Sequence, residues 1–182
     1  MSTNQLIVID SLCLIGVAVV VYFTRAVPSR VFGAAIGGLV AMGVGIGFDA
    51  LGDVMGWWHY TMSATAYTPP LLYLALWLWY GVAVTLIGWR VSRRFGWRGF
   101  IGFIAFMAVY GPLRDYLGVT LTRGTVQIIS SGIRPLLADV VLWSTANTLA
   151  QTVMWSISGA PESDPFARRP FRFVIQGRSA RQ

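Results

Sequence analysis

The stretch VFGAAIGGLVAMGVGIGFDALG, residues 31–52, decides the fold class of this chain. Its one charged side chain is Asp49, close to the end. About 20 apolar residues in succession cross the roughly 30 Å hydrocarbon core of a bilayer as one α-helix. The stretch therefore predicts a membrane-spanning helix. Its glycines include two small-xxx-small pairs, which allow close approach of a second helix: Gly33, Gly37, Gly43 and Gly47.

Four further apolar runs of similar length lie on either side of this stretch. They are Gln5–Thr24, Pro70–Val91, Arg98–Leu117 and Leu136–Ser158. Only 12% of the 182 residues are charged, against about a quarter in a soluble domain. We therefore expect an all-α, polytopic membrane helix bundle of about five transmembrane helices in residues 1–158, followed by a basic tail, 159–182. The first run lacks a basic flank and a small-residue cleavage site, so we expect a retained helix.

Arginine supplies all of the positive charge and is unevenly distributed among the predicted loops. Eleven of the 14 arginines lie between the first two runs, between the third and fourth runs, or in the tail. The exceptions are Arg114, Arg123 and Arg134. Because cytoplasmic loops carry the excess of arginine, we expect a multi-pass protein of the cell membrane, with its N-terminus outside and its C-terminus cytoplasmic. The net charge of +7 then indicates anionic lipid at the tail, Arg168–Arg181, and no nucleic acid.

Scarce residue types exclude several kinds of membrane protein. The chain has no lysine, which excludes a retinal Schiff base and a lysine-containing phosphate loop. Its single cysteine, Cys13, excludes an internal disulfide and an iron–sulfur cluster. Its single histidine, His59, excludes bis-histidine haem ligation; an interfacial role is favoured, with an axial ligand or a proton donor as the alternative. No metal or other cofactor is expected.

Five aspartates fall at one predicted depth, near the outer ends of four different runs. They are Asp10, Asp49, Asp53, Asp115 and Asp139, and Arg114 lies in the same layer. An ionisable side chain at membrane depth costs roughly 2.5–3.5 kcal/mol on insertion scales, and it normally faces a partner or a water-filled cavity. The pattern predicts a polar pocket that opens to the outer leaflet. The alternative is a set of hydrated groups that end helices or pair with Arg114 and Arg134.

The spacing of the acids suggests acid catalysis. Asp49 and Asp53 are four residues apart, so they share a helix face. Two carboxyls this close resist ionising together, which leaves one of them as a potential acid, while Arg114 can hold a third carboxylate ionised. We expect Asp49 to be the proton donor of a catalytic group, with Asp53 and Asp139 tuning it or positioning water.

Polar and aromatic side chains continue this predicted pocket inward. Asp139, Trp143, Asn147 and Gln151 recur every four residues, so they are expected to face the bundle centre, as a pocket wall or as helix–helix hydrogen bonds. The aromatic residues between positions 57 and 80 form either an interfacial belt or a wall that binds an unsaturated chain and stabilises a carbocation. The predicted substrate-binding residues are Asp10, Trp58, Tyr60, Trp77, Tyr80, Arg114, Asp115, Trp143 and Asn147.

The segment from Gly118 to Arg134 contains an alternating, β-branched run, VTLTRGTVQII, residues 119–129. A plain connector between the fourth and fifth helices is favoured. A short outer hairpin and a re-entrant stretch that caps a cavity are the alternatives.

Residues 48–61, FDALGDVMGWWHYT, resemble a motif of the membrane-integral carotenoid biosynthesis family, which includes the bacterioruberin-type hydratases. That motif is an acidic residue, two spacers, glycine, three spacers, glycine and an aromatic turn that ends in tyrosine. The matching residues are Asp49, Gly52, Gly56, Trp58 and Tyr60, and Pro69, Pro70 and Trp77 agree downstream. The family acid is usually glutamate, the aromatic turn is shorter here, and the family usually has more spans.

This resemblance implies chemistry on a polyisoprenoid. A protonated carboxyl would add its proton to a carbon–carbon double bond, and water or an internal double bond would capture the tertiary cation. We therefore expect an intramembrane hydratase or cyclase that acts on an isoprenoid-like lipid, and a homo-oligomer is one state that the sequence leaves open. The first alternative is a non-catalytic membrane subunit that packs in a larger complex through its glycine-rich second helix. The second alternative is a small transporter, which the one-sided acids and the lack of visible inverted repeats disfavour.

Overall fold

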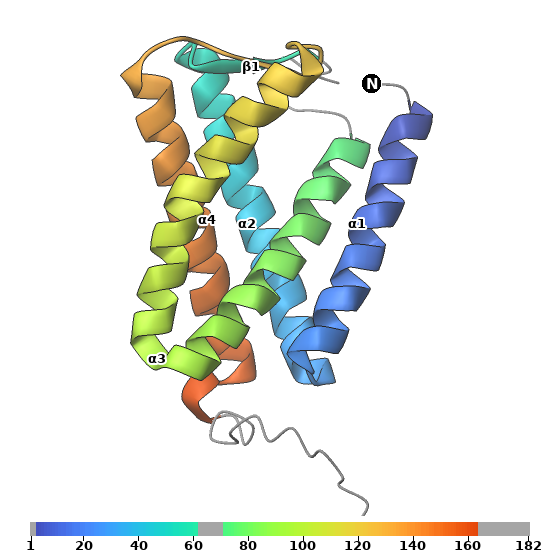
Figure 1. Cartoon of the computed structure of the whole chain (residues 1–182), viewed down its shortest axis with the longest axis vertical. Coiled ribbons are helices and arrows are strands. Elements are labelled where there is room, and N and C mark those ends of the chain that lie inside the picture. The colour runs from blue at the N-terminus through green and yellow to red at the C-terminus, as the bar shows by residue number, and fades with distance from the viewer. Residues whose placement is uncertain (1–2, 62–70, 164–182) are drawn as a thin grey trace, which may run out of the picture.

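The computed structural model describes residues 3–61 and 71–163, and it is helical, as the sequence predicts (Figure 1). The apolar runs become long helices that lie side by side along the longest axis of the molecule. Among the described residues, the helices are α1 (Thr3–Thr24), α2 (Pro28–Val54), α3 (Leu71–Thr122) and α4 (Ile133–Ser158), with a 3-10 turn, η1 (Pro161–Ser163). Two short strands, β1 (Trp58–Tyr60) and β2 (Gln127–Ile129), complete the fold.

Helix α3 contains both the third and the fourth predicted runs. Gly96 interrupts it with φ of 61° and ψ of −147°, a conformation that glycine adopts readily and that a side chain would strain. The helix folds back at this residue, and Figure 1 shows one limb descending to the turn and the other returning from it. A Cβ atom at Gly99 would lie 2.7 Å from the Val91 carbonyl oxygen, so the two limbs touch just beyond the turn.

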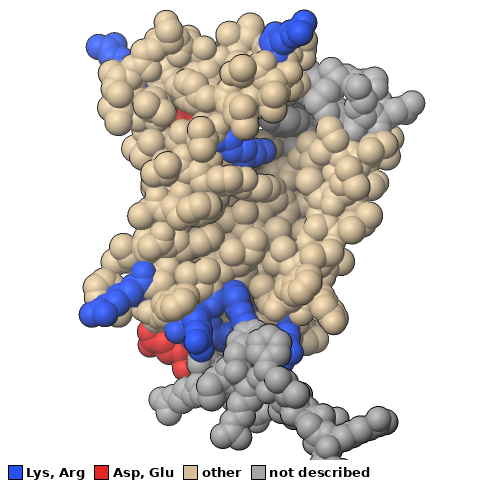
Figure 2. All heavy atoms as spheres, viewed as in Figure 1, with Lys and Arg blue, Asp and Glu red and all other residues tan. Residues whose placement is uncertain are grey.

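Three described segments are long and apolar enough to cross a membrane: Ile7–Thr24, Pro28–Val54 and Leu74–Thr122. Their outward faces carry many exposed apolar side chains, including Leu121 at 74% exposure, which a protein in water would bury. Figure 2 shows arginine gathered mainly toward the ends of the molecule and a middle that is almost free of charge. The chain is therefore a multi-pass membrane protein whose helices contact lipid.

The glycines of α2 have two different environments. Gly33 and Gly37 lie against Ser158 and Ala150 of α4, and a Cβ atom at Gly37 would come within 2.8 Å of the Ala150 carbonyl oxygen. Gly38 packs equally closely on Gly81 of α3. The first small-xxx-small pair therefore does serve helix packing, as predicted. Gly43 and Gly47, the second pair, face open space.

Buried arginines tie the helix ends together at the lower end of the molecule in Figure 1. Arg30 and Arg93 are 8% and 5% exposed, and their guanidinium groups lie 5.0 and 4.6 Å from the centre of the Trp89 ring. Arg30 donates hydrogen bonds to the carbonyls of Ser158 and Gly159 at the end of α4. The negative end of the helix dipole also attracts a cation at the C-terminus of α4. This cluster therefore stabilises the turn-rich end of the bundle.

The upper end is closed by the two-stranded sheet. β1 and β2 pair in antiparallel register, with Trp58 opposite Ile129 and Tyr60 opposite Gln127. The backbone N–H of Ser130 also donates to the Trp57 carbonyl at 2.8 Å. The strand in the segment from Gly118 to Arg134 thus pairs with a segment about 70 residues earlier. The segment is therefore not the plain connector that the sequence predicts, and it is not a hairpin of its own.

Some predicted features lie outside the described residues. They are the basic tail beyond residue 163 and the prolines Pro69 and Pro70.

Candidate acid cavity

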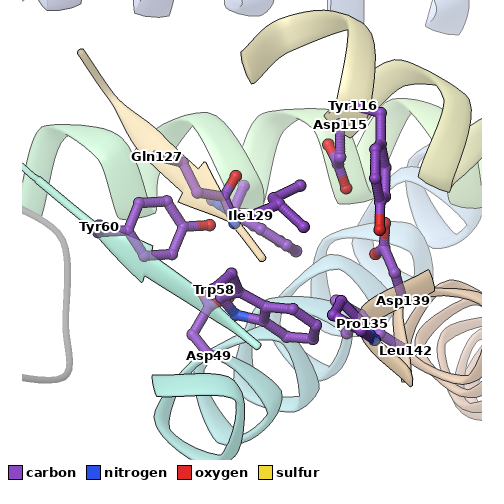
Figure 3. Close-up of a pocket in the computed structure, with 11 residues that line it drawn as sticks. Asp49, Trp58, Tyr60, Asp115, Tyr116, Gln127, Ile129, Pro135, Asp139 and Leu142 are labelled. Carbon is purple, nitrogen blue, oxygen red and sulfur yellow. The ribbon is translucent and has the colours of Figure 1, made fainter. Parts of the chain in front are cut away.

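Three of the five predicted aspartates converge on one cavity beneath the sheet. Asp49 comes from α2, Asp115 from the second limb of α3, and Asp139 from α4 (Figure 3). They lie close enough for electrostatic interaction with one another. The space open to the centre of a water-sized sphere is about 10 Å³, which is room for about one water molecule. The remaining lining residues are Trp58, Tyr60, Trp77, Tyr116, Gln127, Ile129, Pro135 and Leu142.

Local packing explains the spacing of the motif around Asp49. Asp49 is 4% exposed, one turn before Gly52 on α2. A Cβ atom at Gly52 would overlap the Trp58 indole, so only glycine lets this tryptophan fold back against the helix. Gly56, with φ of +67°, makes the turn that returns the chain. The acid, the two glycines and the aromatic residues thus form one unit, in which Trp58 and Tyr60 are the polar neighbours of the Asp49 carboxyl.

Asp115 is held by two donors. Arg114 Nη1 donates to its Oδ1 at 2.8 Å, and the Trp143 indole N–H donates to its Oδ2 at 2.8 Å. The Arg114 guanidinium also lies 4.8 Å from the centre of the Tyr80 ring and 5.5 Å from that of Trp143, within cation–π range. Both oxygens of Asp115 therefore already accept hydrogen bonds, and the Arg114 guanidinium already contacts aromatic rings.

Asp139 is the least satisfied of the three. It is 5% exposed, and its Oδ2 is buried with no hydrogen-bond partner among the described residues. Figure 3 shows its carboxyl on the same side of the cavity as Asp115, beside the Tyr116 ring. A buried polar atom without a partner costs about 1–3 kcal/mol unless water or a ligand satisfies it. The arrangement therefore favours a bound water or substrate at this oxygen.

Charge counting separates the roles of the three acids. In the described part of the chain, Arg114 is the one cation that interacts electrostatically with Asp115 and Asp139. One guanidinium neutralises one carboxylate, and an unpaired buried carboxylate is costly. Because Asp115 holds the arginine, Asp49 and Asp139 are the carboxyls that favour the protonated form. They are the groups that can give a proton to a bound molecule.

Two of the predicted acids lie elsewhere. Asp53 pairs with His59, whose Nδ1 is 2.7 Å from Asp53 Oδ1 on the outer surface, and neither residue lines the cavity. Asp10, on α1, is also absent from the lining, and its Oδ1 is buried without a hydrogen-bond partner in the described chain. Asp49 and Asp53 are four residues apart on α2, yet only Asp49 lines the cavity.

The aromatic residues form two groups. Trp58, Tyr60 and Trp77 line the cavity, whereas Tyr80 and Trp143 lie behind it and hold Arg114. Trp77 and Trp143 stack, with ring centres 6.2 Å apart and planes inclined by 18°.

The polar stripe on α4 is buried, as the sequence predicts. Asn147 donates to the Trp143 carbonyl of its own helix, and Gln151 donates to the Thr85 carbonyl of α3, both within 2.8 Å. Below Asp139, Gln151 therefore joins α4 to α3, whereas Asn147 bonds within its own helix and does not line the cavity.

Five lining residues were not predicted from the sequence: the polar Tyr116 and Gln127, and the apolar Ile129, Pro135 and Leu142. Tyr116 follows Asp115, and its hydroxyl is buried with no hydrogen-bond partner among the residues described. Gln127 enters from β2. A signal for Gln127 was present, because it is the one amide in the alternating run of residues 119–129. Nothing in the pattern around Tyr116 distinguishes it from an interfacial tyrosine.

The geometry also bears on what the cavity can hold. Among the described residues, no three His, Cys, Asp or Glu side chains come close enough together to bind a metal ion. No family model, curated protein or solved structure matches this chain.

Proposed function

We propose that this chain is an integral membrane enzyme that protonates a carbon–carbon double bond of a polyisoprenoid or related lipid. The observation that carries the proposal is the convergence of Asp49, Asp115 and Asp139 on one aromatic-lined cavity, where Arg114 is the one counter-ion among the described residues. A site built only for packing has no use for two buried carboxyls and a third, half-buried one, each of which costs free energy at membrane depth.

The proposed reaction uses the two acids that Arg114 does not engage. The Asp49 carboxyl gives its proton to the double bond, which leaves an aspartate and a tertiary carbocation. Ring faces of Trp58 and Trp77 stabilise the cation. A water molecule, held at Asp139 Oδ2, adds to the cation and loses a proton to a carboxylate, so the net change is addition of one water. In the alternative outcome, cyclisation, an internal double bond captures the cation at constant mass.

The resemblance of residues 48–61 to the membrane-integral carotenoid family supports the same proposal. The glycine and aromatic positions of that motif are the ones that build the wall around Asp49. Three glycines of α2 pack against other helices of the same chain: Gly33, Gly37 and Gly38. Gly43 and Gly47 face open space, so the alternative of a subunit that docks through this part of α2 is decided by the experiment below.

We further propose five spans, with the N-terminus outside and the C-terminus cytoplasmic. The fold-back of α3 at Gly96 makes its two limbs separate crossings, and α4 becomes the fifth because its polar side chains are buried. Six described arginines then lie at the cytoplasmic end and three at the outer end, as the positive-inside rule requires: Arg25, Arg30, Arg90, Arg93, Arg94 and Arg98, against Arg114, Arg123 and Arg134.

The test is a comparison of lipid extracts by liquid chromatography and mass spectrometry. Cells with the intact gene, with a deletion, and with Asp49→Asn or Asp139→Asn restored are compared. We expect an isoprenoid that differs by the mass of water between intact and deleted cells. Asp49→Asn, which keeps the shape but has no proton to give, should resemble the deletion.

The control is Glu162→Gln, the same chemical change on an exposed residue of η1 at the far end of the bundle. It should leave the product unchanged. A shift in retention at constant mass would indicate cyclisation instead of hydration. Identical extracts from intact and deleted cells would overturn the enzyme proposal, and stable co-purification with a larger partner would then favour the subunit alternative.

A further inference from the structure

A second hollow lies far from the acid cavity, in the angle between the two limbs of α3. It is an open groove with a volume of about 520 Å³, close to the turn at Gly96. The first limb contributes Ile87, Val91 and Phe95, which are spaced four residues apart on one face, and the second contributes chiefly Gly102, Phe103 and Phe106. The lining is apolar with one exception, Arg98.

The shape and exposure of this groove suit a hydrocarbon chain. Phe95 and Phe106 on its rim are 64% and 57% exposed, while Phe103 at its base is 6% exposed. Gly102 opens the floor, because a Cβ atom there would meet nothing within 4 Å. In a membrane-embedded bundle the open side of such a groove faces lipid, so acyl chains are the molecules that reach it first.

Arg98 gives the groove a charged end at the level of the lipid headgroups. Its guanidinium lies 6.0 Å from the ring centre of Trp97, which is 64% exposed, and exposed tryptophan is typical of the membrane–water interface. Arg94, four residues earlier on the first limb, is also exposed. The one described acid at this end of the bundle is Glu162, against six arginines, so the local charge favours an anion.

We propose that this groove binds one phospholipid with an anionic headgroup, with an acyl chain between the limbs of α3 and the phosphate against Arg98. The site is independent of the acid cavity and of the reaction proposed there. With the cytoplasmic end assigned as above, the groove lies in the leaflet that carries anionic lipid.

The experiment measures lipid binding to the purified, delipidated protein by native mass spectrometry, with phosphatidylglycerol and phosphatidylcholine as probes. We expect tighter binding of phosphatidylglycerol by the unmodified chain. Arg98→Gln should reduce that preference roughly fivefold, the factor that one arginine near an anionic surface contributes, and Arg98→Lys should restore most of it. Gly102→Leu, which fills the open floor, should reduce binding of both lipids.

The matched control is Gly43→Leu, because Gly43 also faces open space but lies on α2, away from the groove. It should bind both lipids as the unmodified chain does. Equal binding of the two lipids, or equal loss in both leucine variants, would overturn the proposal. Full competition by soluble glycerol phosphate would show a phosphate site without a chain site. A change in the number of protein copies per particle in Gly102→Leu would show a contact between copies instead; either result also rejects the proposal.

Discussion

Arg114 connects the charge balance of the acid cavity to the stability of the fold. Its side chain is 40% exposed, whereas that of Asp115 is 18% exposed, so solvent screens the pair only in part. We expect Arg114→Gln to lower the free energy of unfolding by about 1–3 kcal/mol, less than for a fully buried pair, because Asp115 is left without its counter-charge. Adding Asp115→Asn should recover part of that loss. Chemical denaturation in detergent, followed by tryptophan fluorescence, measures both; strictly additive losses would contradict the coupling.

Asp53 shares a helix face with Asp49 by spacing, but it does not line the acid cavity. Its partner His59 is 58% exposed, and pairs of this kind contribute about 0–1 kcal/mol. We therefore expect Asp53→Asn to change the free energy of unfolding by less than about 1 kcal/mol and to keep the lipid product, in contrast to Asp49→Asn. Loss of product in a folded Asp53→Asn protein would show that the outer ion pair takes part in the reaction.

Within α3, two glycines seven residues apart provide a matched test of how the second limb supports the cavity. A Cβ atom at Gly111 would overlap the Trp143 indole, whereas one at Gly118 meets nothing within 4 Å. Gly111→Ala should displace Trp143 from its hydrogen bond to Asp115, cost about 1–3 kcal/mol and reduce product formation. Gly118→Ala should be neutral or stabilising by up to about 1 kcal/mol, because alanine is the better helix former. Thermal unfolding and the lipid assay together check the pair, and equal behaviour would contradict the packing argument.

At the element scale, the sequence predicts what depends on local pattern. The apolar runs match the described helices closely; the run 31–52, for example, lies within α2 (Pro28–Val54). The inward stripe on α4 was also predicted, because four-residue spacing defines a helix face. The pairing of β1 with β2 was not, since it joins distant segments and depends on how the helices already pack. For the same reason, spacing could not show that Asp115 meets Asp49 while Asp53 does not.

The whole molecule poses a topological problem that α3 answers. A straight helix of 52 residues would be about 78 Å long at 1.5 Å per residue, more than twice the roughly 30 Å hydrocarbon core. Reversal at Gly96 divides it into two limbs of spanning length and brings Arg94 and Arg98 to the end where the α1–α2 connection carries Arg25. Arginines that are far apart in the chain thus gather on one side, which is what the proposed orientation needs.

Single cysteines test this orientation directly, because Cys13 is the one native thiol and Cys13→Ser removes the background. In intact cells, a membrane-impermeant maleimide should label Arg123→Cys, next to the outer sheet, but not Arg25→Cys or Arg94→Cys. After permeabilisation all three should react. Arg25→Cys and Arg94→Cys lie on the same side only if α2 and the first limb of α3 each cross the membrane, and Arg123→Cys lies opposite Arg94→Cys only if the second limb of α3 crosses as well. Labelling of Arg94→Cys alone in intact cells would exclude the five-span arrangement. Labelling of Arg25→Cys and Arg94→Cys without Arg123→Cys would show five spans in the opposite orientation.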